Sequence, residues 1–403
     1  MLIYIYILIT IIVLFYGYRH TIAIKQFFFI HPATQLLLLS LVYLLLPALI
    51  IDENYFKLIA FDDSIYVKLY KYSLYYHSIF LINFIVSIKF SKVKFKFNFN
   101  LSSKSILYLK CILFLASFYL LLIIVFKVIT FGPSLFSLSR TQKYDFYLMV
   151  KSFPGFTFFS FVVLIWAFVV GISRKVLFPV FFLLPLVLLE IICSSRLYIY
   201  DTFILFSLLF VNKYEKELNF KYLLFIGFSF IVVSFFRDGS GDLNNNFITI
   251  LISSSGEFIN TYTSTGLLIE NNYESNLNPI LYSLQYFFPS SLLNTFSMKP
   301  YNINDYLSTM HDFEFGIGSS VLLEGIAFGK TFFYLFPIIV SSFFTFLYNK
   351  ITSSSIVLFY LFLLNIFSVF RGSFLINIGV SIYMFLFLFL FPLFIMYKFE
   401  KNE

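Results

Sequence analysis

Long apolar runs alternate with short polar segments along most of this 403-residue chain. Eleven runs approach the roughly 20 residues that a helix needs to cross a hydrocarbon core. The predicted spans lie near residues 2–18, 33–51, 72–88, 105–126, 153–171, 177–193, 197–211, 222–236, 331–348, 354–370 and 374–397. The first run lacks a basic amino-terminal region and a small-residue cleavage site, which favours a membrane span over a removed signal peptide. The pattern therefore predicts an all-α polytopic membrane protein with about 11 transmembrane helices, in a range of about 10 to 13.

One long interruption, residues 237–316, separates the eighth and ninth runs. It contains the apolar stretches 247–269 and 279–296, which are studded with Ser, Thr, Asn, Tyr and Pro. This mixture predicts interfacial or re-entrant helices over a cavity, where irregular backbone is tolerated if it lines water or protein. No internal repeat and no soluble domain stand out, so residues 1–403 are predicted to form a single integral membrane domain.

Composition agrees with this class. Hydrophobic residues make up 60% of the chain and charged residues only 12%, with a mean hydropathy of +0.90. A soluble domain carries roughly 25% charged residues. Cys111 and Cys193 lie inside apolar runs and indicate neither a disulfide framework nor a metal site. The chain has no P-loop, no dinucleotide-binding fingerprint and no paired aspartates at a membrane edge, so we expect no cofactor, no metal and no nucleic-acid partner.

Charged residues between the spans predict the orientation. Residues 89–104 contain five lysines and no acid, which places this loop in the cytoplasm. Counting spans from it puts the carboxyl terminus on the same side and residues 237–316 on the opposite side. That long segment holds eight acids against Arg237 and Lys299. It is therefore predicted to lie outside the cytoplasm.

Most of the arginines lie on the outer face of this topology, although positively charged residues favour the cytoplasmic face. The chain has six arginines against twenty-two lysines. Four of the six map to the outer face: Arg140, Arg196, Arg237 and Arg371. The planar, permanently charged fork of arginine holds phosphate oxygens bidentately, so several arginines at a membrane surface suit a lipid pyrophosphate head group. The alternative is that each one caps a helix or pairs with a nearby acid such as Asp238 or Asp145.

The stretch HDFEFGIGSSVLLEGIAFG, residues 311–329, combines a histidine, three acids and four glycines. Glu324 lies in an apolar run, and an intramembrane acid is a functional candidate by default. The sequence predicts a helical run over VLLEGIAFG, residues 321–329, on which Ser320 and Glu324 would share one face. Gly318, Gly325 and Gly329 would form a neighbouring small-residue stripe that lets another backbone approach closely. The alternative for Glu324 is a structural hydrogen bond to a neighbouring helix, and a lone histidine such as His311 is more often structural than catalytic.

This stretch resembles the late-chain signature of bacterial oligosaccharide repeat-unit polymerases, the O-antigen polymerases or Wzy proteins. That signature reads G-x-G-x-S-x-x-x-E, followed shortly by Phe-Gly. The matching positions are Gly316, Gly318, Ser320, Glu324, Phe328 and Gly329. The outer arginine in SLSRTQKYDFY, the Ser-Ser-Arg-Leu-Tyr that starts a span and the large acidic outer segment are also similar to that family.

The resemblance implies a membrane glycosyltransferase with a C-type architecture in the bacterial inner membrane, its active site facing the periplasm. Its substrates would be oligosaccharides linked to undecaprenyl pyrophosphate, and a polysaccharide chain-length regulator is a possible partner. Arginines would then stabilise the pyrophosphate leaving group, with Arg196 and Arg237 ahead of Arg140 and Arg371. His311 would orient or deprotonate the acceptor hydroxyl, with Glu257 and Glu324 as its rivals.

Two alternatives stay open at this stage. An O-antigen ligase shares the chemistry, the outer arginines and a periplasmic histidine, but the Gly-Ser-Glu-Phe-Gly signature favours a polymerase. A flippase or another transporter is an alternative of a different class. It would be expected to have two related halves and ionisable groups near the middle of the bilayer, whereas this sequence shows no half-repeat.

Overall fold

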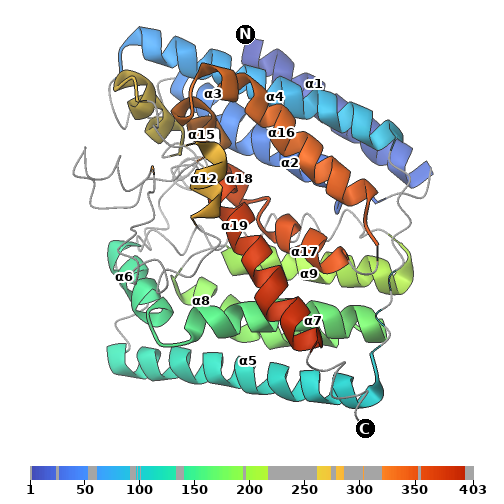
Figure 1. The fold of residues 1–403 in the computed structure, drawn as a ribbon. Helices are drawn as coiled ribbons and strands as arrows, with labels where there is room; N and C mark the ends of the chain where they lie inside the picture. The colour runs from blue at the N-terminus through green and yellow to red at the C-terminus, as the bar shows by residue number, and fades with distance from the viewer. Residues whose placement is uncertain are drawn as a thin grey trace, which may run out of the picture. The chain divides into compact units, whose positions relative to one another are not determined.

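The computed structural model describes residues 2–23, 27–52, 61–90, 97, 99, 101–132, 140–193, 197–216, 261–273, 278–285, 303, 320–352 and 355–394. These residues form helices joined by turns, and no strand occurs among them (Figure 1). The prediction of an all-α protein is confirmed for this part of the chain.

Seven helices in the described part are long and apolar enough to cross a membrane, as judged by length and composition. They are Leu2–Thr21, Pro32–Leu49, Asp63–Phe90, Ser103–Phe131, Phe156–Arg174, Lys330–Asn349 and Phe374–Phe394. Each coincides with a predicted run, so the membrane character of the chain is supported at seven positions. The apolar helix Phe178–Cys193 is shorter.

The remaining predicted runs differ from simple spans. Run 197–211 belongs to the helix Leu197–Tyr214, in which Asp201 and Asn212 reduce the apolar character. Run 354–370 is divided by a turn at residues 365–367, where the Asn365 amide donates to Ser381 Oγ at 2.6 Å. Run 222–236 lies outside the described residues. The total of about 11 spans therefore stays a prediction.

The chain divides into two compact units, and we describe each by itself. The first comprises Met1–Lys94, Ser255–Ile351 and Asn365–Tyr383. Its helices are α1 (Leu2–Ala23), α2 (Pro32–Ser40), the π-helix η1 (Leu41–Leu45), α3 (Leu46–Asp52), α4 (Asp63–Phe90), residues 261–270, α12 (Pro279–Leu284), α15 (Val321–Ala327), α16 (Lys330–Asn349), α18 (Ser368–Arg371) and most of α19 (Phe374–Met384). Within this unit α4 packs against α1, α2 and α16 (Figure 1).

A buried histidine joins three helices of the first unit. His77 of α4 is fully buried. Its Nε2 lies 2.8 Å from Thr10 Oγ1 of α1, and its Nδ1 lies 2.9 Å from Ser40 Oγ at the end of α2. Both imidazole nitrogens therefore have hydrogen-bond partners, as buried polar groups require. This arrangement indicates a structural role for His77.

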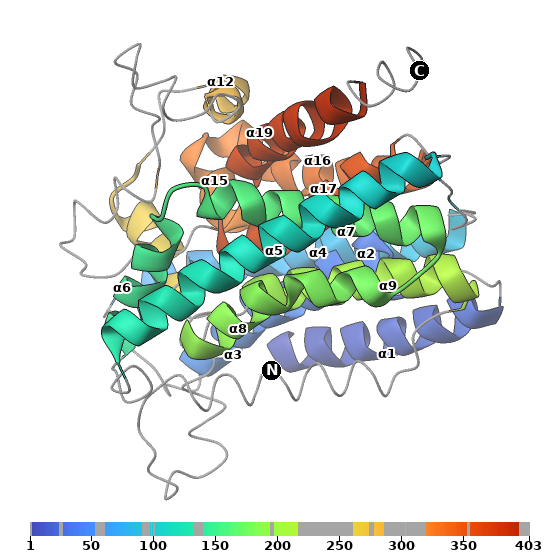
Figure 2. The ribbon, with the colours of Figure 1, turned by 90° about the horizontal axis from the view of Figure 1, so that it is seen from below.

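The second unit comprises Phe95–Ser254, Thr352–Leu364 and Met384–Glu403. Its helices are α5 (Ser103–Phe131), α6 (Arg140–Lys151), α7 (Phe156–Arg174), the 3₁₀-helix η3 (Phe178–Leu183), α8 (Leu184–Cys193), α9 (Leu197–Tyr214), α17 (Ile356–Leu364) and the π-helix η4 (Phe385–Leu390). Helix α5 runs alongside α7, as Figure 1 and Figure 2 both show.

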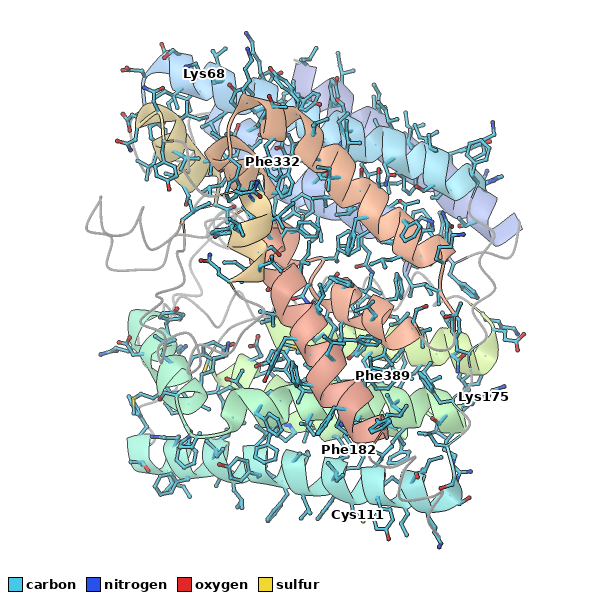
Figure 3. The ribbon with its side chains drawn as sticks, in the orientation of Figure 1. Lys68, Cys111, Lys175, Phe182, Phe332 and Phe389 are labelled. Carbon is cyan, nitrogen blue, oxygen red and sulfur yellow. The ribbon has the colours of Figure 1, made fainter. Side chains whose placement is uncertain are left out.

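Helix α7 is the centre of the second unit. Every side chain from Val162 to Ile172 is buried, as expected of a helix that is apolar on all sides. It packs against α5, α9 and α17. Trp166 lies against Phe389 with ring centroids 6.0 Å apart, and Phe389 is labelled in Figure 3. Whether the two units act as one domain, as the sequence predicts, stays a prediction.

Candidate functional site

The structure places only part of the predicted site. Glu324 is fully described and belongs to α15 of the first unit. Arg140 begins α6 and Arg371 ends α18, in each case as backbone without a described side chain. Four candidates lie outside the described residues: Glu257, Arg196, Arg237 and His311.

Local hydrogen bonds explain where α15 begins and ends. Ser320 is the N-cap, and its hydroxyl accepts from the Leu323 N–H at 3.2 Å. Serine suits this position because its oxygen satisfies one of the free N–H groups of the first turn. The helix ends at Ala327, and Gly329 takes a φ of +91° before α16 begins. The expected continuous helical run through Gly329 is therefore interrupted, because its backbone conformation favours glycine and breaks the helix.

The Glu324 side chain is 0% exposed and joins two helices. Its Oε1 accepts from the Ser373 hydroxyl, and its Oε2 accepts from the Phe374 N–H at 3.0 Å. Ser373 Oγ in turn accepts from the Ile376 N–H at 3.1 Å. Free N–H groups at a helix start require acceptors, and here one of them comes from a residue 50 positions earlier in the chain. Glu324 therefore fixes the start of α19 against α15.

This contact brings two predicted site residues into one neighbourhood. Arg371 precedes Ser373 by two residues, at the end of α18, and α15 packs against α18. The backbone of the Arg371–Phe374 turn thus lies next to the Glu324 carboxyl group. Arg140 belongs to the second unit.

Gly325 provides room for a tyrosine. A Cβ atom at this position would overlap the Tyr76 hydroxyl of α4. That hydroxyl donates to the Phe333 carbonyl at 3.0 Å, and Tyr76 is fully buried. The small-residue stripe predicts that another backbone approaches closely at this glycine. The neighbour at Gly325 is a side chain instead.

Helix α12, from the long segment 237–316, contacts the same site. It begins at Pro279 after the N-cap Asn278, in agreement with the predicted apolar stretch that starts there. The Tyr282 ring packs edge-on to Phe328 with centroids 5.2 Å apart. Ser283 Oγ donates to the Leu375 carbonyl at 2.7 Å. The long segment, the glycine-rich stretch and the start of α19 therefore meet in the first unit.

Burial determines the protonation of Glu324. Helix α15 lies outside the seven helices that qualify as spans. Desolvation raises the pKa of Glu324 from its ordinary value of 4.5 to about 8, and the hydrogen bonds from Ser373 and Phe374 oppose the rise. The carboxyl group is therefore mostly neutral near pH 7. With both oxygens engaged, it is better suited to hold a backbone turn than to deprotonate a substrate.

The structure also contains a second group of buried polar side chains, which is absent from the candidates predicted from the sequence. It lies in the second unit, where the Tyr147 hydroxyl of α6 donates to Glu190 Oε1 of α8 at 3.3 Å. Asp201 of α9 interacts electrostatically with Glu190 and with Tyr360 of α17, and all four side chains are buried. The signal was present, because Glu190 and Asp201 interrupt predicted spans as Glu324 interrupts an apolar run. An acid inside an apolar run is a functional candidate wherever it occurs, so the same rule that singles out Glu324 applies to these two acids.

Within the described part of the chain, no group of three or more His, Cys, Asp or Glu side chains could hold a metal ion. Comparisons with protein-family models, with curated proteins and with solved structures find no match.

Proposed function

We propose that this protein polymerises lipid-linked oligosaccharide repeat units. The glycan carried by one undecaprenyl pyrophosphate is transferred to the outer sugar of a second lipid-linked unit, at the periplasmic face of the bacterial inner membrane. The product is O-antigen or a related surface polysaccharide. The described helices support a membrane protein, and the more specific assignment rests on the glycine-rich signature.

The observation that carries this proposal is the organisation of the signature. Ser320 starts α15, and Glu324 holds the turn that follows Arg371. The hydrogen bonds of Glu324 to Ser373 and Phe374 give the acid of this motif a structural role, because they hold an arginine-bearing turn. In the proposal, Arg371 is held at the substrate-facing end of α19 by this clamp.

The proposed chemistry needs cations where the pyrophosphate leaves. Negative charge develops on the phosphate oxygens as the anomeric bond breaks, and fixed arginine forks stabilise that charge. We assign this role first to Arg196 and Arg237, and then to Arg140 and Arg371. No metal is required when arginines neutralise the diphosphate.

The acceptor hydroxyl needs a base or an orienting hydrogen-bond acceptor. We assign this role to His311, whose ordinary pKa lies near neutrality, with Glu257 as the alternative. Glu324 becomes the weakest of the three candidates, because Ser373 and Phe374 occupy its two oxygens. Its proposed role is to position Arg371. A chain-length regulator stays a proposed partner.

Deletion of the gene that encodes this protein, in its native cell, tests the function directly. We expect surface polysaccharide to lose its ladder on a gel and to show a single attached repeat unit. Loss of all attached glycan would instead identify a ligase. Accumulation of lipid-linked units inside the cell would identify a flippase. Either of these two results would refute the polymerase proposal.

If these arginines bind pyrophosphate through bidentate forks, lysine should not be able to replace them. We expect Arg196→Lys and Arg237→Lys to make almost as little polymer as the alanine variants, because a point charge does not replace a bidentate fork. Polymer length on a gel, with protein level measured on a blot, checks this. Arg174→Lys at the end of α7 is the matched control and should keep the ladder. Normal polymer from both site variants would leave only a general electrostatic role.

A further inference from the structure

Helix α16 contains a proline near its middle. Pro337 lies inside Lys330–Asn349, one of the seven helices that could span a membrane, and its side chain is buried. Proline has no N–H, so it cannot donate the helical hydrogen bond to the carbonyl four positions earlier, which is that of Phe333. A carbonyl inside a membrane span needs another donor, which a neighbouring helix can supply.

Two adjacent tyrosines of α4 donate to this turn of α16. The Tyr76 hydroxyl donates to the Phe333 carbonyl at 3.0 Å. The Tyr75 hydroxyl donates to the Tyr334 carbonyl, three positions before the proline, at 2.8 Å. Helices α4 and α16 both belong to the first unit, where they lie side by side (Figure 1). Tyr76 therefore supplies the hydrogen bond that Pro337 removes, and Tyr75 adds a second one beside it.

Packing holds the Tyr76 hydroxyl in this position. The Tyr76 ring lies against the Phe333 ring with centroids 5.1 Å apart, and the Tyr72 ring lies 4.5 Å from the same Phe333 ring. Gly325 of α15 leaves the space that the hydroxyl occupies, because an added Cβ atom there would overlap it. One buried hydroxyl thus connects α4, α15 and α16.

The two parts of α16 on either side of Pro337 are anchored to α4 separately. The first segment, residues 330–336, is only about two helical turns long. A helix this short is not stable by itself, so its position depends on the contacts that it makes. The second segment, residues 338–349, has an anchor of its own, because Thr345 Oγ1 lies 3.1 Å from Ser87 Oγ of α4.

We propose that Pro337 is a hinge in α16, and that Tyr75 and Tyr76 form a latch that holds the first segment against α4. In the latched state, which the structure shows, both hydroxyls donate to carbonyls of α16. When they release these carbonyls, the first segment and the adjoining α15 move about Pro337, while the second segment stays anchored through Thr345. A proline suits a hinge because the missing hydrogen bond makes the helix easier to bend at this point. The latch is independent of the proposed function.

Hydrogen–deuterium exchange of the full-length protein in lipid nanodiscs tests the latch. We expect the double variant Tyr75→Phe/Tyr76→Phe to speed amide exchange in residues 330–336 by about 5-fold or more, because losing one hydrogen bond of ordinary strength shifts an opening equilibrium by about this factor. Amides of residues 338–349 should keep their wild-type rates. The matched control is Ser87→Ala, which weakens the second anchor and should speed exchange in residues 338–349 only.

Pro337→Ala provides the decisive comparison. Alanine restores an N–H that can donate to the Phe333 carbonyl, so the hydroxyl of Tyr76 is no longer its only donor. In this background, Tyr76→Phe should speed exchange in residues 330–336 by less than about 2-fold, against about 5-fold in the presence of the proline. Equal effects in the two backgrounds would overturn the proposal.

Tyr75→Phe covers the case in which Tyr76→Phe fails to fold. Tyr75 is half-buried, and the substitution keeps its ring against Phe333, at 6.0 Å between centroids. We expect faster exchange in residues 330–336 and wild-type exchange in residues 338–349. Unchanged exchange, or an equal increase in both segments, would overturn the proposal, because α16 would then behave as one continuous helix.

Discussion

Replacement of Glu324 by alanine is expected to lower the free energy of unfolding by roughly 2–5 kcal/mol, because the Ser373 hydroxyl and the Phe374 N–H lose their buried acceptor. The variant also leaves a cavity between α15 and the start of α19. We expect less folded protein in the membrane and a lower melting temperature in detergent. Because the Arg371 turn loses its clamp, polymer should fall further than protein level does.

Glu324→Gln is the matched control for this change. Glutamine has the shape of the neutral acid, so its amide oxygen can accept from the Phe374 N–H while its amide nitrogen donates to Ser373 Oγ. We expect nearly normal protein levels and reduced but detectable polymer. A well-folded Glu324→Gln protein that makes no polymer would contradict the positioning role and return Glu324 to the list of candidate bases.

The raised pKa of Glu324 also predicts how the stability of the folded protein depends on pH. Its folded pKa of about 8 lies above its ordinary value of 4.5, so the folded state binds the proton more tightly. This contribution to stability is complete below 4.5 and is lost as the pH rises through about 8. Melting temperatures of wild type should therefore fall across this window, and those of Glu324→Gln should fall less. Parallel curves would contradict a raised pKa.

Gly325→Ala is expected to destabilise the protein by about 1–3 kcal/mol, a typical cost of overpacking a core. The new Cβ would overlap the Tyr76 hydroxyl. Tyr76 has little freedom to move, because its hydroxyl is bonded to the Phe333 carbonyl and its ring packs against the Phe333 ring at 5.1 Å. Melting temperature and folded yield in detergent measure the effect.

The double variant Tyr76→Phe/Gly325→Ala separates two effects of Gly325→Ala. One is the clash with the Tyr76 hydroxyl, and the other is the lower backbone flexibility of alanine. Tyr76→Phe removes the overlapping oxygen and, alone, should cost about 1 kcal/mol for the lost hydrogen bond. In the Tyr76→Phe background, Gly325→Ala should be less destabilising than in wild type. Relief should be partial, because the Tyr76 ring carbon Cζ would still lie 3.1 Å from the added Cβ. Equal effects in the two backgrounds would rule out the clash.

Sequence and structure agree most closely where interactions between neighbouring residues determine the position of a helix. Apolar length predicted the seven helices that could span a membrane. Local polarity also accounts for the start of α12 at Pro279 and for the N-cap at Ser320. The end of α15 was placed two residues too late, because an apolar run does not reveal that Gly329 will take a positive φ.

The sequence by itself determined the class of molecule, because apolar length and charge spacing are properties of neighbouring residues. It also singled out Glu324, although its partners remained unknown. The tertiary structure decided that Glu324 meets Ser373 and Phe374, and that Glu190 meets Tyr147. These partners lie 43 to 50 residues apart in the chain. Only the packing of distant helices brings such groups within hydrogen-bonding distance, and no local pattern specifies it.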